Sequence, residues 1–288
     1  MPEPQSAIFD RHYGDHLFLE FALGGGHDLD AVRAALRDSL ALSNETTSLI
    51  VAFGPGLWRH LDHHFDFPAF SLEGKAPATQ GDLFVWIQAE NRSDLFDTGY
   101  AVQRLLAEPL QLQLKVQSFV YRDSRDLTGF VDGIGNPQGE AARQAAIIAE
   151  PHPAAGGSWV LSQKWVHDLE AFAALPVAEQ ENVFGRTKAD AVEFDDERMP
   201  ADAHVGRTDV AHYGVAQKIW RRSVPYTSAT EEGLYFLAFS CELSRFEYLL
   251  RRMYGLVDDG VRDRLLDYTQ PQTSSWWYAP TREWLAGL

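Results

Sequence analysis

HLFLEFAL at residues 16–23, DLDAVRAALRDSLAL at 28–42 and TTSLIVAFG at 46–54 decide the fold class of this chain. The first and third segments are short and rich in apolar residues, as strands are. The second carries apolar residues at the spacing of an amphipathic helix. The stretch therefore predicts the order strand, helix, strand.

The same order returns further along the first half. GDLFVWIQAE at 81–90 predicts a strand, the segment 94–108 a helix, and LQLKVQSFVYRD at 112–123 another strand. Two such units in succession fit one ferredoxin-like α+β domain.

The second half contains the same kinds of element, joined by longer segments. GSWVLSQKWVH at 157–167 and GLYFLAFSCEL at 233–243 predict inner strands. RFEYLLRRMYG at 245–255 predicts an amphipathic helix that ends at its glycine. We therefore expect an α+β fold built on antiparallel sheets.

Composition narrows the function classes. The chain has 288 residues, of which 45% are hydrophobic and 23% charged, so it can bury a cofactor in one large or two ordinary domains. Its net charge of −16 opposes a nucleic-acid partner, which needs a basic face. One cysteine, Cys241, excludes an intramolecular disulfide and any cluster of several thiolates. The first residues lack the pattern of a secretory signal, and no apolar stretch is long enough to cross a bilayer, so we expect a cytoplasmic protein without a membrane partner.

GFVDGIGNP at 129–137 is the most informative motif for function, because it sets the carboxylate of Asp132 between glycines. Glycine has no side chain and tolerates unusual backbone angles, so the loop can approach a ligand closely. Taken alone, the motif is equally typical of a tight turn. A histidine and an arginine in the second half of the chain decide between the two interpretations.

Two motifs nearer the C-terminus complete a pattern: ADAHVGRTD contains His204, and KIWRRSVPYT contains Arg221. With Asp132 they resemble the dye-decolorizing peroxidases, a family of haem enzymes, and most closely its bacterial B-type group. The resemblance extends through YRDSRDLTGF, GGSWVLSQKW, ENVFGRTK, GLYFLAFS and DYTQPQTSSWWYAP, and so covers nearly the whole chain. The family usually has Thr and Glu where this chain has Ile134 and Gly135.

The family resemblance implies two ferredoxin-like domains, with haem b held mainly by the second. We place them at residues 1–127 and 128–288. Dimers or larger rings are common in the family, so a homo-oligomer is expected. The chain ends at WLAGL, without an evident tail for packing into an encapsulin shell.

On the proximal side of haem, the resemblance implies that His204 is the axial iron ligand, and hence the metal-binding residue. A proximal imidazole usually donates its other ring N–H to an acceptor, and a carboxylate acceptor makes it more electron-rich. Asp267, in RLLDYTQP, resembles a position that supplies this acceptor, although a solvated aspartate at the end of a helix explains it equally well.

On the distal side, Asp132 is the expected acid–base group for hydrogen peroxide, and Arg221 the expected cation that stabilises negative charge as the O–O bond breaks. Arg222 is adjacent, but neighbouring side chains on a strand point to opposite faces, so only one arginine can face the iron. The family pattern selects Arg221, and Ser223 then becomes a third distal polar group.

Further contacts with haem are expected from several residues. Arg186, in FGRTKAD, matches a family arginine that binds a haem propionate. Phe236 and Phe239 lie in a strand expected to line the macrocycle, where core packing accounts for them equally well. The haem edge is expected beside Gly133, Ile134 and Gly135.

The implied function is a haem peroxidase that uses hydrogen peroxide to oxidise dyes, phenols or similar small donors through a ferryl intermediate. Bulky dyes need an aromatic exit route, and Trp276, Trp277 and Tyr278 are one candidate; strand alternation predicts that one tryptophan is exposed and the other buried. Two alternatives stay open: a protein that releases iron from haem or oxidises porphyrinogens, and a haem-binding or storage protein without turnover.

Overall fold

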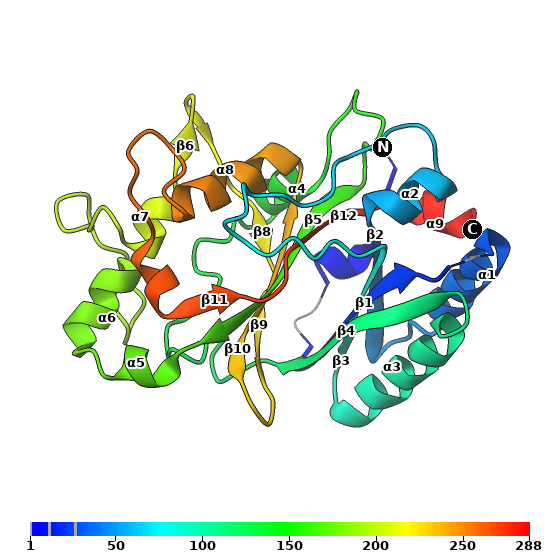
Figure 1. Ribbon diagram of the computed structural model, residues 1–288, viewed down its shortest axis with the longest axis horizontal. Helices are drawn as coiled ribbons and strands as arrows, with labels where there is room; N and C mark the ends of the chain where they lie inside the picture. The colour runs from blue at the N-terminus through cyan, green and yellow to red at the C-terminus, as the bar shows by residue number, and fades with distance from the viewer. Residues whose placement is uncertain (1, 11–12, 26–27) are drawn as a thin grey trace.

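The structure is a computed structural model that describes residues 2–10, 13–25 and 28–288. In Figure 1 most of the first half of the chain lies on the right, coloured from blue to teal, and most of the second half lies on the left. All ladders between the paired strands are antiparallel in the described part of the chain. The prediction of an α+β fold with antiparallel sheets is confirmed.

Four strands and two long helices form the first half, as the hydrophobic pattern predicts. Side-chain caps begin both helices: Asp28 accepts from the N–H groups of Asp30 and Ala31 before the first, and Asn91 accepts from those of Ser93 and Asp94 before the second. The four strands lie in the order β4-β1-β3-β2. The elements are β1 (Asp15–Leu23), α1 (Leu29–Leu40), β2 (Thr47–Phe53), α2 (Pro55–Leu61), β3 (Leu83–Ala89), α3 (Arg92–Leu106) and β4 (Leu110–Phe119).

The second half has an equivalent strand order, β12-β5-β10-β9, with β11 and β8 added at its edges. Helix α8 covers its outer face, and Gly255, with a φ of 65°, follows the end of that helix as predicted. The elements are β5 (Ser158–His167), β8 (Trp220–Arg221), β9 (Val224–Thr227), β10 (Glu232–Ser240), α8 (Leu243–Met253), β11 (Thr269–Pro271) and β12 (Ser275–Ala279).

Shorter elements fill the connections. They are η1 (Ser6–Ile8), α4 (Glu140–Ala146), α5 (Leu169–Ala173), α6 (Val177–Phe184), α7 (His204–Thr208), β6 (Ala211–His212), β7 (Val215–Ala216), η2 (Arg264–Asp267) and α9 (Arg282–Ala286). Within the described ranges, none of the helices combines the length and the apolar character that a membrane span requires.

The sheets of the two halves pair with each other along both of their edge strands. Tyr278 of β12 pairs with Phe53 of β2, and Ser118 of β4 pairs with Tyr226 of β9. Because β5 and β10 also pair, the order β5-β12-β2-β3-β1-β4-β9-β10 closes on itself as a ring of eight strands. The ring separates an enclosed interior from an outer face, and successive residues of each strand point alternately to one and the other.

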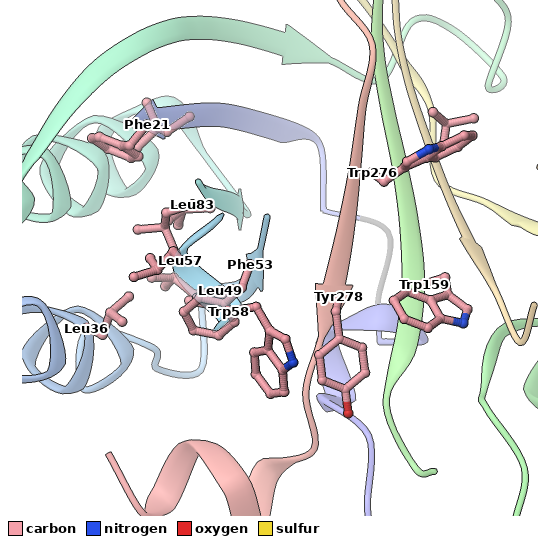
Figure 2. Packing of buried hydrophobic residues seen from close by; sticks show 14 of the residues in the cluster. Phe21, Leu36, Leu49, Phe53, Leu57, Trp58, Leu83, Trp159, Trp276 and Tyr278 are labelled. Atoms are coloured by element: carbon pink, nitrogen blue, oxygen red, sulfur yellow. The ribbon is translucent and has the colours of Figure 1, made fainter. Parts of the chain in front are cut away.

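The outer face carries the larger hydrophobic core. Figure 2 shows part of it, where Trp58 of α2 packs near Phe53 and Tyr278. Trp276 belongs to the same core, whereas Trp277 points into the ring and belongs to the second core there. Neither tryptophan is exposed, at 3% and 0%, so the expectation of one exposed indole in this strand is wrong. β12 is therefore covered on its outer face by the larger core and on its inner face by the core inside the ring.

The interior of the ring contains one acidic side chain among the described residues. Glu20 is 3% exposed, and its Oε1 accepts hydrogen bonds from Tyr235 at 2.6 Å and Ser162 at 3.0 Å. Ser162 in turn accepts from Nε1 of Trp277 at 2.9 Å. Burial disfavours the charged carboxylate and raises the pKa of Glu20 from 4.5 to about 7, although the two hydrogen bonds oppose this shift.

This buried carboxyl makes stability depend on pH. Because the folded pKa of Glu20 is about 7 and the ordinary value is 4.5, its stabilising contribution is complete below 4.5 and disappears as the pH rises through 7. Between about pH 5 and 8 the wild type should lose roughly 2 to 3 kcal/mol of unfolding free energy that Glu20→Gln does not lose. Urea unfolding of both proteins at each pH measures the difference. Parallel pH profiles would contradict the expectation.

Candidate functional site

A cavity of about 1370 Å³, its opening to solvent included, lies on the outer face of the second half. Its wall on the sheet side comes from odd-numbered residues of β5 and even-numbered residues of β10, as strand alternation requires. Facing this wall are α7, α8 and η2. Most of the lining surface is apolar, and it comes from Phe130, Leu161, Trp165, Phe184, Val205, Ile219, Leu234, Phe236, Phe246, Leu249, Leu250, Met253 and Leu265.

His204 lines this cavity from the first turn of α7. Its Nδ1 lies 2.7 Å from Oδ2 of Asp263, whose side chain is fully buried. Asp263 is itself fixed, because its Oδ1 caps η2 by accepting from the N–H of Leu265. Nε2 of His204 makes no hydrogen bond with any residue in the described ranges. A ring held through Nδ1 with Nε2 available is the arrangement of a metal-ligating histidine.

The carboxylate that holds His204 is therefore not the predicted one. Asp267 pairs instead with Arg262 at 2.5 Å, and its side chain is 53% exposed. The two candidates lie four residues apart around η2, and the cap at its N-terminus turns Asp263 toward α7 while Asp267 stays at the surface. The prediction that Asp267 contacts His204 is wrong.

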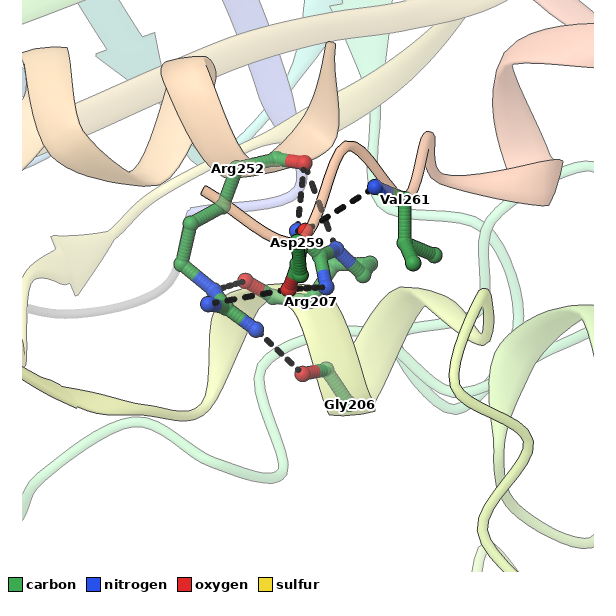
Figure 3. A network of polar contacts seen from close by, with 5 residues as sticks. All are labelled: Gly206, Arg207, Arg252, Asp259 and Val261. Atoms are coloured by element: carbon green, nitrogen blue, oxygen red, sulfur yellow. Dashed lines mark hydrogen bonds and ion pairs between the residues drawn. The ribbon is translucent and has the colours of Figure 1, made fainter. Parts of the chain in front are cut away.

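Helix α7 is anchored by a buried arginine, as Figure 3 shows. Arg207 is 2% exposed and donates to both carboxylate oxygens of Asp259, at 2.7 and 3.0 Å. It also donates to the carbonyl of Arg252, whose guanidinium donates back to the carbonyls of Arg207 and Gly206. These reciprocal bonds fix the helix that carries His204 against α8.

Removing this anchor should be costly. Arg207→Ala leaves the carbonyl of Arg252 and the carboxylate of Asp259 without this donor, and we expect a loss of about 1 to 3 kcal/mol in unfolding free energy. The matched control is Arg59→Ala, because Arg59 holds Asp66 through similar paired bonds with a side chain that is 60% exposed. That change should cost less than about 1 kcal/mol. Equal shifts of the urea midpoint in the two variants would contradict the anchoring role.

The loop GFVDGIGNP brings Asp132 to the cavity. The N–H of Asp132 donates to the carbonyl of Ser124, and the N–H of Gly133 donates to Oδ1 of Asp132 at 2.7 Å. Gly129 has a φ of 90°, and a Cβ there would lie 2.7 Å from the side chain of Lys188. The positive φ favours glycine at this position, whereas the flexible end of Lys188 could move away from a larger residue.

Arg221 reaches the same cavity and is held by Asn136. The Asn136 amide accepts from the backbone N–H of Arg221 at 3.0 Å and donates to its carbonyl at 2.9 Å. Arg222 points the other way, into the ring, where it donates to the carbonyl of Ile8 and to Oε1 of Gln88. Asn136 was not singled out from the sequence, although it lies within the same glycine-rich motif.

Arg186 also lines the cavity and is 7% exposed. Its Nε has no hydrogen-bond partner among the described residues. Burial lowers the pKa of its guanidinium, and the nearby carboxylate of Asp132 opposes this shift. A buried cation with an unsatisfied donor is suited to an anionic group of a ligand.

The remaining predicted residues divide between the cavity and other places. Phe236 and Gly135 line it, but Phe239 points into the ring and packs on Trp86, because residues three apart on a strand face opposite sides. Its predicted contact with haem is wrong. Ile134 is 40% exposed and lies outside the lining of the cavity.

A second hollow adjoins the cavity and shares four lining residues with it, Asp126, Asp132, Arg221 and Leu234. Ser223 and Gly133 line this hollow. The Ser223 hydroxyl accepts from the N–H of Leu237 at 3.3 Å. Ser223 shares this hollow with Asp132 and Arg221 and does not line the main cavity.

The cavity wall also contains a buried acid–imidazole contact that the sequence did not suggest. Oδ1 of Asp126 lies 3.1 Å from Nε2 of His167, whose Nδ1 lies 2.7 Å from the hydroxyl of Thr269. Burial alone would raise the pKa of Asp126, but its bonds from His167 and Thr128 hold that pKa below its ordinary value. The two partners are 41 residues apart, and only the fold joins them.

These features fit the haem group that the resemblance implies. The cavity offers an imidazole with a free Nε2, a long apolar lining for a flat macrocycle, and a buried guanidinium for a carboxylate substituent. Asp132 and Arg221 line the same space and supply the polar groups for a reaction.

Comparison with known proteins identifies the family. A family model described as Dyp-type peroxidase, C-terminal, matches residues 123–284. A dye-decolorizing peroxidase of Mycolicibacterium paratuberculosis is 38% identical over 214 residues, which make up 73% of this chain and 60% of that protein. One from Rhodococcus erythropolis is 33% identical over 290 residues, covering 93% of this chain and 84% of the relative.

Solved structures agree with this result. A DypB variant from Rhodococcus jostii RHA1, in complex with heme, has a TM-score of 0.88 and 31% identity, and the match covers 99% of this chain and 98% of that one. The family model covers more than half of the sequence, and the Rhodococcus erythropolis relative is matched along most of its length. The chain therefore belongs to the family of Dyp-type peroxidases.

Proposed function

We propose that this protein is a haem b peroxidase that uses hydrogen peroxide to oxidise small one-electron donors. One observation carries the proposal: His204, held through Nδ1 by buried Asp263, lines the same cavity as Asp132 and Arg221. Family membership supports it independently, since the relatives are named dye-decolorizing peroxidases.

The residues for holding the cofactor follow from their chemistry. His204 would ligate the iron through Nε2, and Asp263 would keep the ring oriented and basic. Arg186 would bind a propionate, and Phe236 would contact the macrocycle. When bound, haem supplies an iron centre that takes oxidising equivalents from peroxide and passes them on one electron at a time.

The distal residues would handle protons and charge. Asp132 would take a proton from one oxygen of peroxide and return it to the other, which leaves as water. Arg221 would stabilise the negative charge that develops as the O–O bond stretches, and Asn136 would keep its backbone in place. Ser223, in the adjoining hollow, would orient water or peroxide.

Dyes and phenols are the proposed donor classes, and dyes are the class that the names of the relatives contain. We further propose that the two halves are ferredoxin-like domains, at residues 1–127 and 128–288, and that the second holds most of the haem. The cavity supports this, because all of its lining residues except Asp126 lie within residues 128–288. A homo-oligomer remains part of the proposal.

An absorption spectrum of the purified, haem-loaded protein, before and after stoichiometric peroxide, tests the function. We expect the spectrum of a histidine-ligated haem and a change on adding peroxide that a phenol reverses. His204→Ala should lose the first spectrum. A normal haem spectrum that peroxide leaves unchanged would contradict the proposal and indicate haem storage. Recovery of iron-free porphyrin would indicate iron release instead.

A further inference from the structure

Tyr235 and Glu20, inside the ring of strands, are joined by a short hydrogen bond that the proposed mechanism does not use. The phenol of Tyr235 donates to Oε1 of Glu20 at 2.6 Å, and the exposed fractions of the two residues are 0% and 3%. They come from opposite halves of the chain, Glu20 from β1 and Tyr235 from β10.

Aromatic rings surround this bond. The Tyr235 ring is stacked on Phe18, with centroids 3.8 Å apart and planes 12° from parallel. The same oxygen of Glu20 accepts from Ser162, which in turn accepts from Nε1 of Trp277. The site is thus a phenol with a dedicated proton acceptor, isolated from water by close packing.

Tyr235 also lies directly behind the wall of the cavity. Its chain neighbours Leu234 and Phe236 both line that cavity, whereas the Tyr235 side chain points to the opposite face of the same strand. Only the thickness of the sheet therefore separates the phenol from the space that would hold haem. The hydroxyl of Tyr278 has no carboxylate acceptor among the described residues, since it donates to the backbone carbonyl of Ala154.

We propose that Tyr235 and Glu20 form a buried redox site, in which Tyr235 gives one electron to peroxide-oxidised haem while its phenolic proton passes to Glu20. The O–H bond of the phenol breaks and one forms on the carboxylate, leaving a neutral tyrosyl radical and a neutral acid. The oxidant is the one that the proposed function supplies, so the inference rests on that function. An external donor returns the electron, and Glu20 then returns the proton.

Transfer of the phenolic proton to Glu20 makes the oxidation of Tyr235 energetically feasible. A phenol that loses an electron but keeps its proton would place a positive charge in an apolar interior, which is strongly unfavourable. Transfer to Glu20 avoids that charge. It also exchanges one ionised carboxylate for a neutral one, which burial favours, as the pKa of about 7 shows.

The proton acceptor makes the radical depend on pH. With a pKa of about 7, Glu20 is ionised and able to accept above this value and is already protonated below it. The residues that bond to Glu20 are Tyr235 of β10 and Ser162 of β5, and Trp277 of β12 bonds to Ser162. Elsewhere in the ring, His16 of β1 accepts from Trp86 through Nδ1, and Arg222 lies over the Trp86 ring. Neither of these contributes to the pKa shift of Glu20.

Electron paramagnetic resonance of the holoenzyme tests the site. Samples are frozen rapidly after one equivalent of peroxide, without a reducing substrate, and an optical spectrum is recorded in parallel. We expect a tyrosyl radical in the wild type at about pH 8, reduced about tenfold or more at about pH 5. Tyr235→Phe and Glu20→Gln should lose it to the same extent, while Tyr278→Phe, a comparably buried control, should keep it.

The outcomes separate this inference from the proposed function. If peroxide changes the optical spectrum but the radical persists in Tyr235→Phe, or never forms, the inference is wrong and the peroxidase function stands. An unchanged optical spectrum would contradict both. Infrared spectra without peroxide add a readout that needs no turnover: a protonated carboxyl band at about pH 5, absent in Glu20→Gln, should shift in Tyr235→Phe. A band that does not respond to Tyr235→Phe would overturn the pairing.

Discussion

Asp132→Asn should slow the reaction of the haem-loaded protein with hydrogen peroxide by about 10²–10⁴-fold, the usual contribution of a positioned acid–base group. The amide keeps the size of the side chain but cannot accept the proton of peroxide. The hydrogen bond from the N–H of Gly133 can still be accepted by the amide oxygen, so the loop should keep its shape. Stopped-flow absorbance at increasing peroxide concentration measures the bimolecular rate constant.

The pH profile of this rate gives a second readout. The pH profiles of the wild type and Asp132→Asn should differ, because an amide can neither take a proton from peroxide nor return one. The control is Asp123→Asn, which alters an exposed carboxylate in the same connection between β4 and α4, where it pairs with Arg125. If the rate constant and pH profile of Asp132→Asn match those of the wild type, the acid–base role of Asp132 is refuted.

The second large effect concerns Asp263. Asp263→Asn keeps a hydrogen-bonding side chain beside Nδ1 of His204 but removes the negative charge that makes the imidazole electron-rich. We expect haem to be retained about 10- to 100-fold less tightly, the range that partners of metal-ligating histidines contribute at other metal sites. Transfer of haem from the protein to an excess of a stronger haem-binding protein measures the loss.

Asp267→Asn is the matched control, since Asp267 differs from Asp263 by four positions and pairs with Arg262 at the surface. It should leave haem retention unchanged. The iron reduction potential should rise in Asp263→Asn alone, because a less basic ligand stabilises ferric iron less well. Equal behaviour of the two variants would show that the buried carboxylate does not act on the histidine.

Local patterns in the sequence predicted the helices and strands of the first half and the loop of Asp132. The spacing of hydrophobic residues and the positions of glycines depend directly on local structure. Alternation along a strand also indicated that only one of Arg221 and Arg222 faces the cavity, and the family resemblance selected Arg221. The same rule, applied to Phe236 and Phe239, would have excluded one of them.

Other parts of the site depend on contacts between distant segments and left no local signal. Asp263 reaches His204 across 59 residues, and Tyr235 reaches Glu20 across 215. A carboxylate four residues from the true partner fits a sequence pattern equally well, and only the cap of η2 distinguishes them. Likewise, the burial of both tryptophans in β12 follows from closure of the ring, which places that strand between two cores.

Closure of the ring has a consequence for how the protein is made. The edge of β2 and the indole of Trp58 are covered by Tyr278 and Trp284, which a ribosome adds long after the first half of the chain. Until those residues are synthesised, the first half exposes an unpaired strand edge and an apolar surface. Both features favour association between nascent chains. The demand for chaperones should therefore persist until β12 docks against β2.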